Sequence, residues 1–240
     1  MVNIQISGSV MDYLSINQQY WNGTYHAPNP ESFIFRFYGR ILCYDYNITG
    51  QEGESLLDFG CGQGGALSFF RSKGFNTYGV DIAPQDLEIA RCVVPDSANN
   101  FMLVDNQPNE NLVFFPEIQT RGGFDVVVSI QTLDFLSNSD FQKAIKCVYN
   151  NMKPGAKIFA SMNAWEMYYR QNSIYIGDGL WHVQFDNGRV KYDLGLNFTK
   201  DKDEMREKFS LFEPVYIDHY DHSFREEGSE KRFTFFGIKK

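Results

Sequence analysis

The chain has 240 residues, of which 43% are hydrophobic and 22% charged, a composition typical of a soluble globular protein. Its net charge is −8 and its pI is near 5.0, so a broad phosphate-binding face is disfavoured and we expect no nucleic-acid partner. No apolar run approaches the roughly 18 residues of a membrane helix, and the N-terminus lacks the features of a signal peptide, so we expect no membrane association. The four cysteines are scattered without a C-x-x-C pair, which indicates reduced thiols, no metal site and a cytoplasmic location.

Strands alternate with helices through the middle of the chain, which predicts a parallel sheet with helices on both faces. Helices are predicted at 64–73, at 84–92 and from Ser139 or Asp140 to about Met152. Strands are predicted at 55–59, 76–81, 101–104, 124–130, 156–161, 214–220 and 232–239. The last two strands flank the segment DHSFREEGSE as a long hairpin, so the sheet should finish antiparallel. We therefore predict an α/β fold with a seven-stranded, mostly parallel, doubly wound sheet.

The first 50 residues fall outside this alternation. They suggest helices at about 11–20 and 31–44, which we expect to pack on the sheet as an N-terminal helical cap. Residues 51–240 would then form the main domain.

A second irregular region precedes the last two strands. It contains the pair Asn187-Gly188, a strong signal for a two-residue hairpin turn, so we predict an inserted β-hairpin within about 163–198. Such an insertion beside the sheet commonly contributes to a substrate pocket, and surface decoration is the alternative interpretation. Its aromatic side chains would either line that pocket or form a core.

The first predicted strand runs into the glycine-rich turn of "SLLDFGCGQGG". Gly60, Gly62 and Gly65 satisfy the dinucleotide-binding pattern G-x-G-x-x-G, which expects an acidic residue about 20 positions further on. Asp81 follows Gly62 by 19 positions and meets this expectation. The glycines alone therefore do not separate a nicotinamide dinucleotide from S-adenosylmethionine.

Asp58 favours the second ligand. It stands two residues before Gly60, where a pyrophosphate-binding turn normally keeps an apolar side chain. An anion there would repel phosphates, whereas S-adenosylmethionine carries a sulfonium and an ammonium group that a carboxylate stabilises. Capping of the turn amides is the alternative role for Asp58.

Five ordered motifs resemble those of class I S-adenosylmethionine-dependent methyltransferases, a Rossmann-like family. They are LLDFGCGQGG, YGVDIA, MLVDNQP, FDVVVSIQTLDFL and KPGAKIFASM, and they cover residues 55–162. Their order is more specific than any single motif, and the ending FTFFGIKK resembles the closing antiparallel strand of that fold. The resemblance implies S-adenosylmethionine as cofactor and S-adenosylhomocysteine as product.

The resemblance also implies roles for the first half of the site. The main chain of Gly60, Cys61 and Gly62 would face the methionine part of the cofactor, with Asp58 near its ammonium group. Asp81 would accept hydrogen bonds from both ribose hydroxyls, which suits a carboxylate.

The later motifs imply the adenine side and the floor of the site. Ile82 would pack on the face of the adenine, and Asp105 and Asn106 would meet its edge. Ile130 and Gln131, at the end of the fourth predicted strand, would lie beneath the transferred methyl group. Ligand binding at the carboxyl ends of strands is the rule for open α/β sheets.

The segment QQYWNGTYHAPNPESFIFRF resembles the opening of some bacterial methyltransferases, several of them linked to capsule or other surface-glycan pathways. By that likeness Tyr20, Trp21 and Tyr25 would close over the cofactor. Arg36 would pair with the cofactor carboxylate, a task suited to a planar guanidinium group. Ordinary helix packing is the alternative role for Arg36.

Methyl transfer needs an aligned acceptor and exclusion of water, and a hydroxyl acceptor also benefits from a general base. Asp134, just after the fourth predicted strand, and His182, in the predicted hairpin, are the candidates for this base. Any lone histidine is more often an ordinary polar residue.

Residues 129–132 read Ser-Ile-Gln-Thr, so the Asn-Pro-Pro-Tyr type of motif used on exocyclic base amines is absent there. Together with the acidic charge, this favours a small-molecule acceptor, most specifically a hydroxyl of a sugar or sugar-nucleotide in surface-glycan synthesis. The alternatives are an N-methyltransferase of a small metabolite and a non-catalytic S-adenosylmethionine-binding protein, with an NAD(P)-dependent oxidoreductase less favoured. The sequence identifies neither the acceptor nor the oligomeric state.

Overall fold

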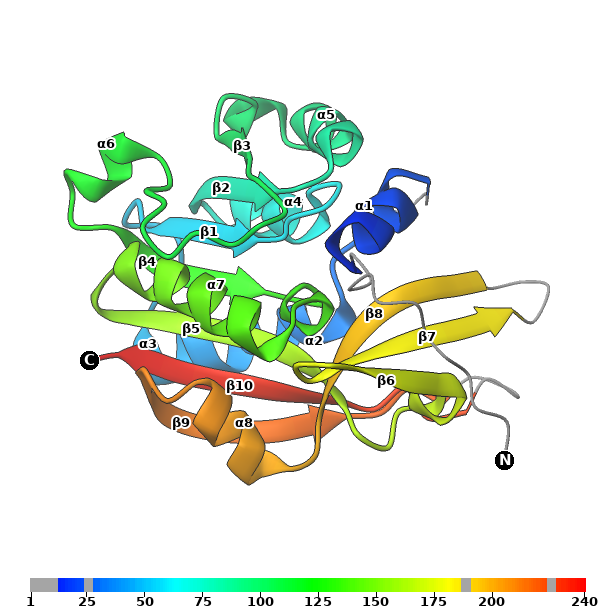
Figure 1. The fold of residues 1–240 in the computed structure, drawn as a ribbon. Helices are drawn as coiled ribbons and strands as arrows, with labels where there is room; N and C mark the ends of the chain where they lie inside the picture. The colour runs from blue at the N-terminus through cyan, green and yellow to red at the C-terminus, as the bar shows by residue number, and fades with distance from the viewer. Residues whose placement is uncertain (1–12, 24–27, 187–190, 224–227) are drawn as a thin grey trace, which may run out of the picture.

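The computed structural model describes residues 13–23, 28–186, 191–223 and 228–240 (Figure 1). Its main sheet has the spatial order β3 (Phe101–Leu103), β2 (Asn76–Asp81), β1 (Ser55–Phe59), β4 (Phe124–Ser129), β5 (Met152–Ala164), β10 (Arg232–Lys239) and β9 (Phe212–Tyr220). The first five strands of this order are parallel, and β10 runs antiparallel to both of its neighbours. The predicted α/β fold, a mostly parallel sheet that finishes antiparallel, is confirmed.

Helices cover both faces of this sheet (Figure 1). One face carries α2 (Ser32–Arg36), α3 (Tyr44–Tyr46), α4 (Gly65–Ser72) and α5 (Pro84–Val93). The other face carries α6 (Pro116–Gln119), α7 (Asn138–Asn150) and α8 (Lys202–Lys208). Short 3-10 helices occupy Pro95–Ser97, Leu133–Phe135 and Tyr168–Asn172.

The two hydrophobic clusters explain why the central strands are apolar at successive positions. On β4, Val126 and Val128 face one cluster, and Val127 faces the other. On β1, Leu56 and Leu57 divide in the same way. Because both faces are buried, neither strand shows the alternation of a half-exposed strand.

The N-terminal region splits into two parts. Residues 32–46 form one helical run, in which α2 and α3 are joined by a π-helical stretch, Phe37–Cys43. Ile34 and Phe37 from this run join the cluster that covers the sheet, as expected for the cap. In contrast, α1 (Tyr13–Gly23) contacts β8 (Lys191–Thr199), at the carboxyl-end edge of the sheet (Figure 1).

Several element boundaries differ from the predicted ones, and two of these differences have a local cause. Helix α7 begins at Asn138 rather than after Ser139 or Asp140, because the Ser137 hydroxyl accepts a hydrogen bond from the Asp140 amide and caps the helix. Strand β5 begins at Met152 rather than at the predicted residue 156, so it contains Pro154 and Gly155. Gly155, with φ +77°, absorbs an irregularity in the pairing of β5 with β4.

The insertion is a three-stranded antiparallel sheet rather than a hairpin. It consists of β6 (Ser173–Gly177), β7 (Leu180–Asp186) and β8, which pairs with the end of β5 in parallel. The predicted turn at Asn187-Gly188 lies outside the described residues. A tight turn joins β6 to β7, and its residues Gly177, Asp178 and Gly179 all have positive φ. This turn adds β6 as a third strand.

The aromatic side chains of the insertion pack largely on one another. The Trp165 and Trp181 rings lie 5.4 Å apart edge to face, and the Tyr169 ring lies 4.7 Å from that of Tyr192. They therefore form a local core in the insertion. None of the described helices is both long and apolar enough to cross a bilayer.

Candidate active site

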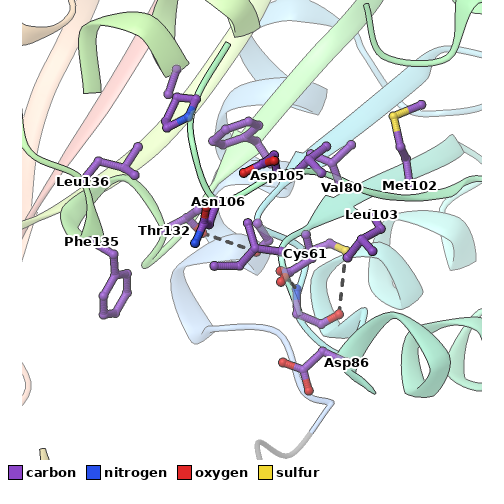
Figure 2. A pocket seen from close by; sticks show the side chains of 18 of the residues that line it. Cys61, Val80, Asp86, Met102, Leu103, Asp105, Asn106, Thr132, Phe135 and Leu136 are labelled. Carbon is purple, nitrogen blue, oxygen red and sulfur yellow. Dashed lines mark hydrogen bonds between the residues drawn. The ribbon is translucent and has the colours of Figure 1, made fainter. Parts of the chain in front are cut away.

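A cavity of about 530 Å³ lies at the carboxyl ends of β1, β2 and β4 (Figure 2). Its walls come from the loops after these strands, from the loop after β3 and from the N-terminal segment. Nine residues predicted from the sequence line it, namely Gly60, Cys61, Gly62, Asp81, Ile82, Asp105, Asn106, Ile130 and Gln131. The structure thus brings most of the predicted cofactor residues around one space.

The glycine turn forms one wall of this cavity. The amides of Gly60 and Cys61 both donate to the carbonyl oxygen of Val80, at 2.9 and 3.0 Å, which holds the turn against β2. Gly60 has φ +84°, and a Cβ on it would lie 2.2 Å from the Thr132 side chain. A Cβ on Gly62, whose φ is +48°, would meet no atom within 4 Å. The main chain at Gly62 is therefore open to a ligand.

Asp81 stands between this turn and the start of α5. Its two carboxylate oxygens accept hydrogen bonds from the amides of Gly62, at 2.8 Å, and Ala83, at 2.9 Å. A carboxylate offers about four acceptor positions, so capacity remains for further donors. Burial raises the pKa of Asp81, and the amide hydrogen bonds offset part of that increase.

Asp58 is 4% exposed and does not line the cavity itself. Its carboxylate accepts no hydrogen bond from the residues that the structure describes, and the turn amides of Gly60 and Cys61 donate elsewhere, so Asp58 does not cap them. Burial, and secondarily the charge of Asp81, raise the pKa of Asp58 well above its usual range. A buried carboxyl group without a partner is costly, and a cationic ligand group would relieve that cost.

The adenine-side loops are tied together by a residue that the sequence did not indicate. The Asn106 amide donates to Oε1 of Gln18 at 3.1 Å, and Nε2 of Gln18 donates to the Ile82 carbonyl at 3.1 Å. Asp105 is exposed at the cavity, and its carboxylate accepts the Gln107 amide at 2.9 Å. Gln18 lies on α1 and is 64 positions from Ile82 in the sequence, so no local motif could have revealed this contact.

On the opposite side, Gln131 joins the end of β4 to the N-terminal segment. Its φ of +54° is uncommon for a residue other than glycine, and such conformations concentrate at functional sites. Its main-chain amide donates to the Ser161 hydroxyl, and its side-chain amide donates to the Glu31 carboxylate, each at 2.9 Å. Glu31 lines the cavity and was not predicted as a site residue.

Asp134 lies away from the cavity lining. It is 1% exposed, and its carboxylate is 3.1 Å from the Arg232 guanidinium group. Burial raises the pKa of Asp134, and the positive charge of Arg232 offsets part of that increase. In this arrangement Asp134 serves a buried ion pair, so the structure does not bring the predicted base to the cavity.

His182 also lies away from the cavity lining. Its Nε2 is 2.7 Å from the Asp193 carboxylate on β8. Its neighbours on β7, Trp181 and Val183, join the aromatic cluster of the insertion. Because side chains alternate along a strand, His182 points to the opposite face from that cluster.

The residues predicted to close over the cofactor have mixed placements. The Tyr20 ring packs 5.9 Å from the Tyr192 ring, within the cluster of the insertion. The side chain of Trp21 and the whole of Tyr25 lie outside the described residues. Arg36 is exposed on α2 and does not line the cavity.

The charged side chains of the cavity wall share one sign. They are Glu31, Asp81, Asp86 and Asp105, and the described lining residues include no lysine, arginine or histidine. In the described part of the chain, no three His, Cys, Asp or Glu side chains gather as a metal site would require.

These features are those that a sulfonium nucleoside requires. The open main chain at Gly62 and the unused acceptor capacity of Asp81 fit the methionine and ribose parts of S-adenosylmethionine, and the negative charges of the cavity wall suit its cationic groups. The residues present therefore fit the cofactor that the motifs imply.

Comparison with known proteins agrees with this site. A methyltransferase domain family matches residues 31–194. The ubiquinone biosynthesis O-methyltransferase of Idiomarina loihiensis is 30% identical over 130 residues, which cover 51% of this chain and 47% of that protein. The ribosomal protein L11 methyltransferase of Paraburkholderia xenovorans is 26% identical over 175 residues, covering 66% and 53% of the two chains. The chain thus spans about half the length of these curated relatives.

Solved structures share the fold at lower identity. An S-adenosylmethionine-dependent methyltransferase from Methanosarcina mazei superposes with a TM-score of 0.64 and 18% identity, covering 88% of this chain and 98% of that one. The magnesium protoporphyrin IX methyltransferase of Synechocystis PCC 6803, solved with S-adenosylmethionine bound, has a TM-score of 0.60 and 14% identity, covering 98% and 100%. The chain therefore belongs to the methyltransferase domain family and has the fold of class I S-adenosylmethionine-dependent methyltransferases.

Proposed function

We propose that this protein transfers the methyl group of S-adenosylmethionine to a small-molecule acceptor. The observation that carries the proposal is the glycine turn, where the main chain at Gly62 opens to the cavity that Asp81 also lines. Asp58 has no hydrogen-bond partner among the described residues, and Asp81 has acceptor capacity left. The family assignment supports the same activity.

When bound, S-adenosylmethionine supplies a methyl group on a positively charged sulfur that a nucleophile can displace. The residues of this chain would contribute binding, orientation and exclusion of water. Asp81 would orient the ribose through its free acceptor positions. Asp58 would stabilise positive charge, and the wall formed by Glu31 and Gln131 would border the acceptor.

The charge of the cavity refines the acceptor class. Four carboxylates line the wall without a described cationic side chain, so a diphosphate would be repelled at close range. We therefore propose a neutral hydroxyl or an amine as the methylated group, and among sugars a neutral sugar rather than a sugar-nucleotide. The sugar class itself is supported by the resemblance of the N-terminal segment alone, because the aromatic side chains of the insertion pack on one another.

Among the charged residues that line the cavity, Glu31 accepts a hydrogen bond from the side chain of Gln131, just after the end of β4. We propose it, in place of Asp134 or His182, as the carboxylate that receives a proton from a hydroxyl acceptor. An amine acceptor would need only to arrive unprotonated.

The test has two stages. In the first, melting temperatures are measured with S-adenosylhomocysteine and with NAD⁺, and only the former should raise them. A rise with NAD⁺ alone would refute the proposal. In the second, labelled S-adenosylmethionine is supplied with separate pools of neutral sugars, amines and sugar-nucleotides, and labelled product should form in the first or second pool. Label found only in the sugar-nucleotide pool would contradict the acceptor class while leaving methyl transfer intact.

A further inference from the structure

Helix α1 spans the cavity between its two walls. Leu14 and Asn17, one helical turn apart, both line the cavity. Figure 1 shows α1 between α5, on the cofactor side, and β8 of the insertion. Because α1 is part of the cavity wall, a displacement of the helix would widen the cavity on that side.

Among the hydrogen bonds of the described residues, those of Gln18 attach α1 to the loops on the cofactor side. Gln18 donates to the carbonyl of Ile82 and accepts from the side-chain amide of Asn106, both at 3.1 Å. These two residues follow β2 and β3, respectively, in the loops assigned to the adenine. One glutamine therefore bridges two separate loops and the helix.

On the insertion side, α1 is attached through Asn17. Its side chain accepts the amide of Gly195 at 2.9 Å and donates to the carbonyl of the same residue at 3.0 Å, so it completes the edge of β8 as a neighbouring strand would. It also donates to the carbonyl of Phe135 at 3.1 Å. Gly195 permits this approach, since a Cβ there would lie 3.2 Å from Cβ of Tyr13.

We propose that α1 is a gate over the cofactor cavity and that Gln18 is the positioning residue that latches it to the adenine-side loops. This inference rests on the proposed function, because it takes S-adenosylmethionine and S-adenosylhomocysteine as the ligands that pass. Opening at the adenine side breaks two hydrogen bonds between uncharged groups, which are individually weak. The Tyr13 hydroxyl, bonded to the Asp140 carboxylate and the Ser137 amide, and Asn17 hold the other side of α1, so the domain need not unfold. The attachment through Asn17 links the same movement to the insertion.

A gate and a simple ligand contact predict different kinetics. If ligand passes only while α1 is open, weakening the latch raises the open fraction and speeds both association and dissociation. If Gln18 merely contacted the ligand, its loss would speed dissociation alone. If it only stabilised the fold, the melting temperature would fall and the exchange rates of folded protein would stay the same.

The experiment measures association and dissociation of S-adenosylhomocysteine by stopped-flow fluorescence with wild type and Gln18→Ala. Losing both bonds should accelerate both rates about five- to thirtyfold, and the dissociation constant should change less than about threefold. Gln18→Glu, which keeps an acceptor for Asn106 but loses the donor to Ile82, should give intermediate rates. The matched control is Gln142→Ala, which removes a bond to the Lys208 carbonyl, 3.5 Å long, away from the cavity lining.

A second readout needs no ligand. Amide hydrogen exchange over residues 13–23 should be faster in Gln18→Ala than in wild type, and unchanged in Gln142→Ala. Unchanged rates of ligand exchange, or faster dissociation with unaltered association, would overturn the gate. Failure of the wild type to bind S-adenosylhomocysteine would instead refute the proposed function. Binding by the wild type is therefore measured before any variant is compared.

Discussion

Replacement of Asp81 by asparagine tests the assignment of the cofactor site most directly. The substitution removes the charge and turns one of the two carboxylate oxygens into an amide nitrogen, which then opposes the amide of either Gly62 or Ala83. The lost main-chain bond destabilises the fold, but the neutral side chain is cheaper to bury, and burial already raises the pKa of Asp81. We therefore expect unfolding free energy to change by no more than about 1 kcal/mol.

The effect on ligand affinity should be larger. Asp81→Asn removes a charge-assisted hydrogen bond to the ribose, worth about 1.5–3 kcal/mol, which corresponds to a roughly 10- to 150-fold weaker binding of S-adenosylhomocysteine. Calorimetric titration measures this directly. The matched control is Asp86→Asn, which removes the same charge from the same cavity and keeps an oxygen for its bond from Gln63 Nε2, 2.9 Å long.

The two variants separate a hydrogen bond from general electrostatics. Asp86→Asn should bind S-adenosylhomocysteine within about fivefold of wild type if orientation of the ribose is what Asp81 provides. Equal losses in both variants would show that only the total charge of the cavity matters. An unchanged affinity in Asp81→Asn would refute the assignment of the ribose site.

Three further variants probe the glycine turn. Asp58→Asn should stabilise the ligand-free protein by about 1–2 kcal/mol at pH 7. The pKa of Asp58 is raised in the folded state, so the wild type loses stability as the pH rises above the pKa of the unfolded chain, and the advantage of the variant should shrink towards pH 4 in thermal melts. An advantage that grows towards acid would contradict the assignment. Gly62→Asn should weaken the binding of S-adenosylhomocysteine at least tenfold with little change in melting temperature, because asparagine tolerates positive φ and its side chain would enter the open space. An unaltered affinity in calorimetry would count against ligand binding at this turn. Gly60→Ala should lower the unfolding free energy by about 2–4 kcal/mol in urea titration, through its φ of +84° and the contact with Thr132, and a neutral result would show that the turn relaxes.

Expectations that depend on local chain geometry agree with the structure. The apolar runs of β1 and β4 identify strands buried on both faces, and the glycine turn lines the cavity. The position of Asp81 at the cavity is predictable as well, because Asp81 ends the neighbouring parallel strand β2 and the carboxyl ends of parallel strands meet at one edge of the sheet.

Expectations about side chains outside that edge fared differently. Asp134 was a reasonable base by its position after β4, but Arg232, 98 residues later, holds it in a buried ion pair. His182 lies in the insertion as expected, yet the alternation of β7 turns it away from the aromatic cluster. Neither outcome is encoded in the neighbouring sequence.

The sequence by itself determined the α/β class, the order of the central strands' motifs and the position of the cofactor turn, because hydrophobic period and glycine conformation act within a few residues. Only the tertiary structure decided that Glu31 lines the cavity beside Gln131 and that Gln18 and Asn17 fasten α1 across the cavity. Those contacts join residues 64 to 178 positions apart, and their partners are mostly main-chain carbonyls and amides, which carry no mark in the amino-acid code.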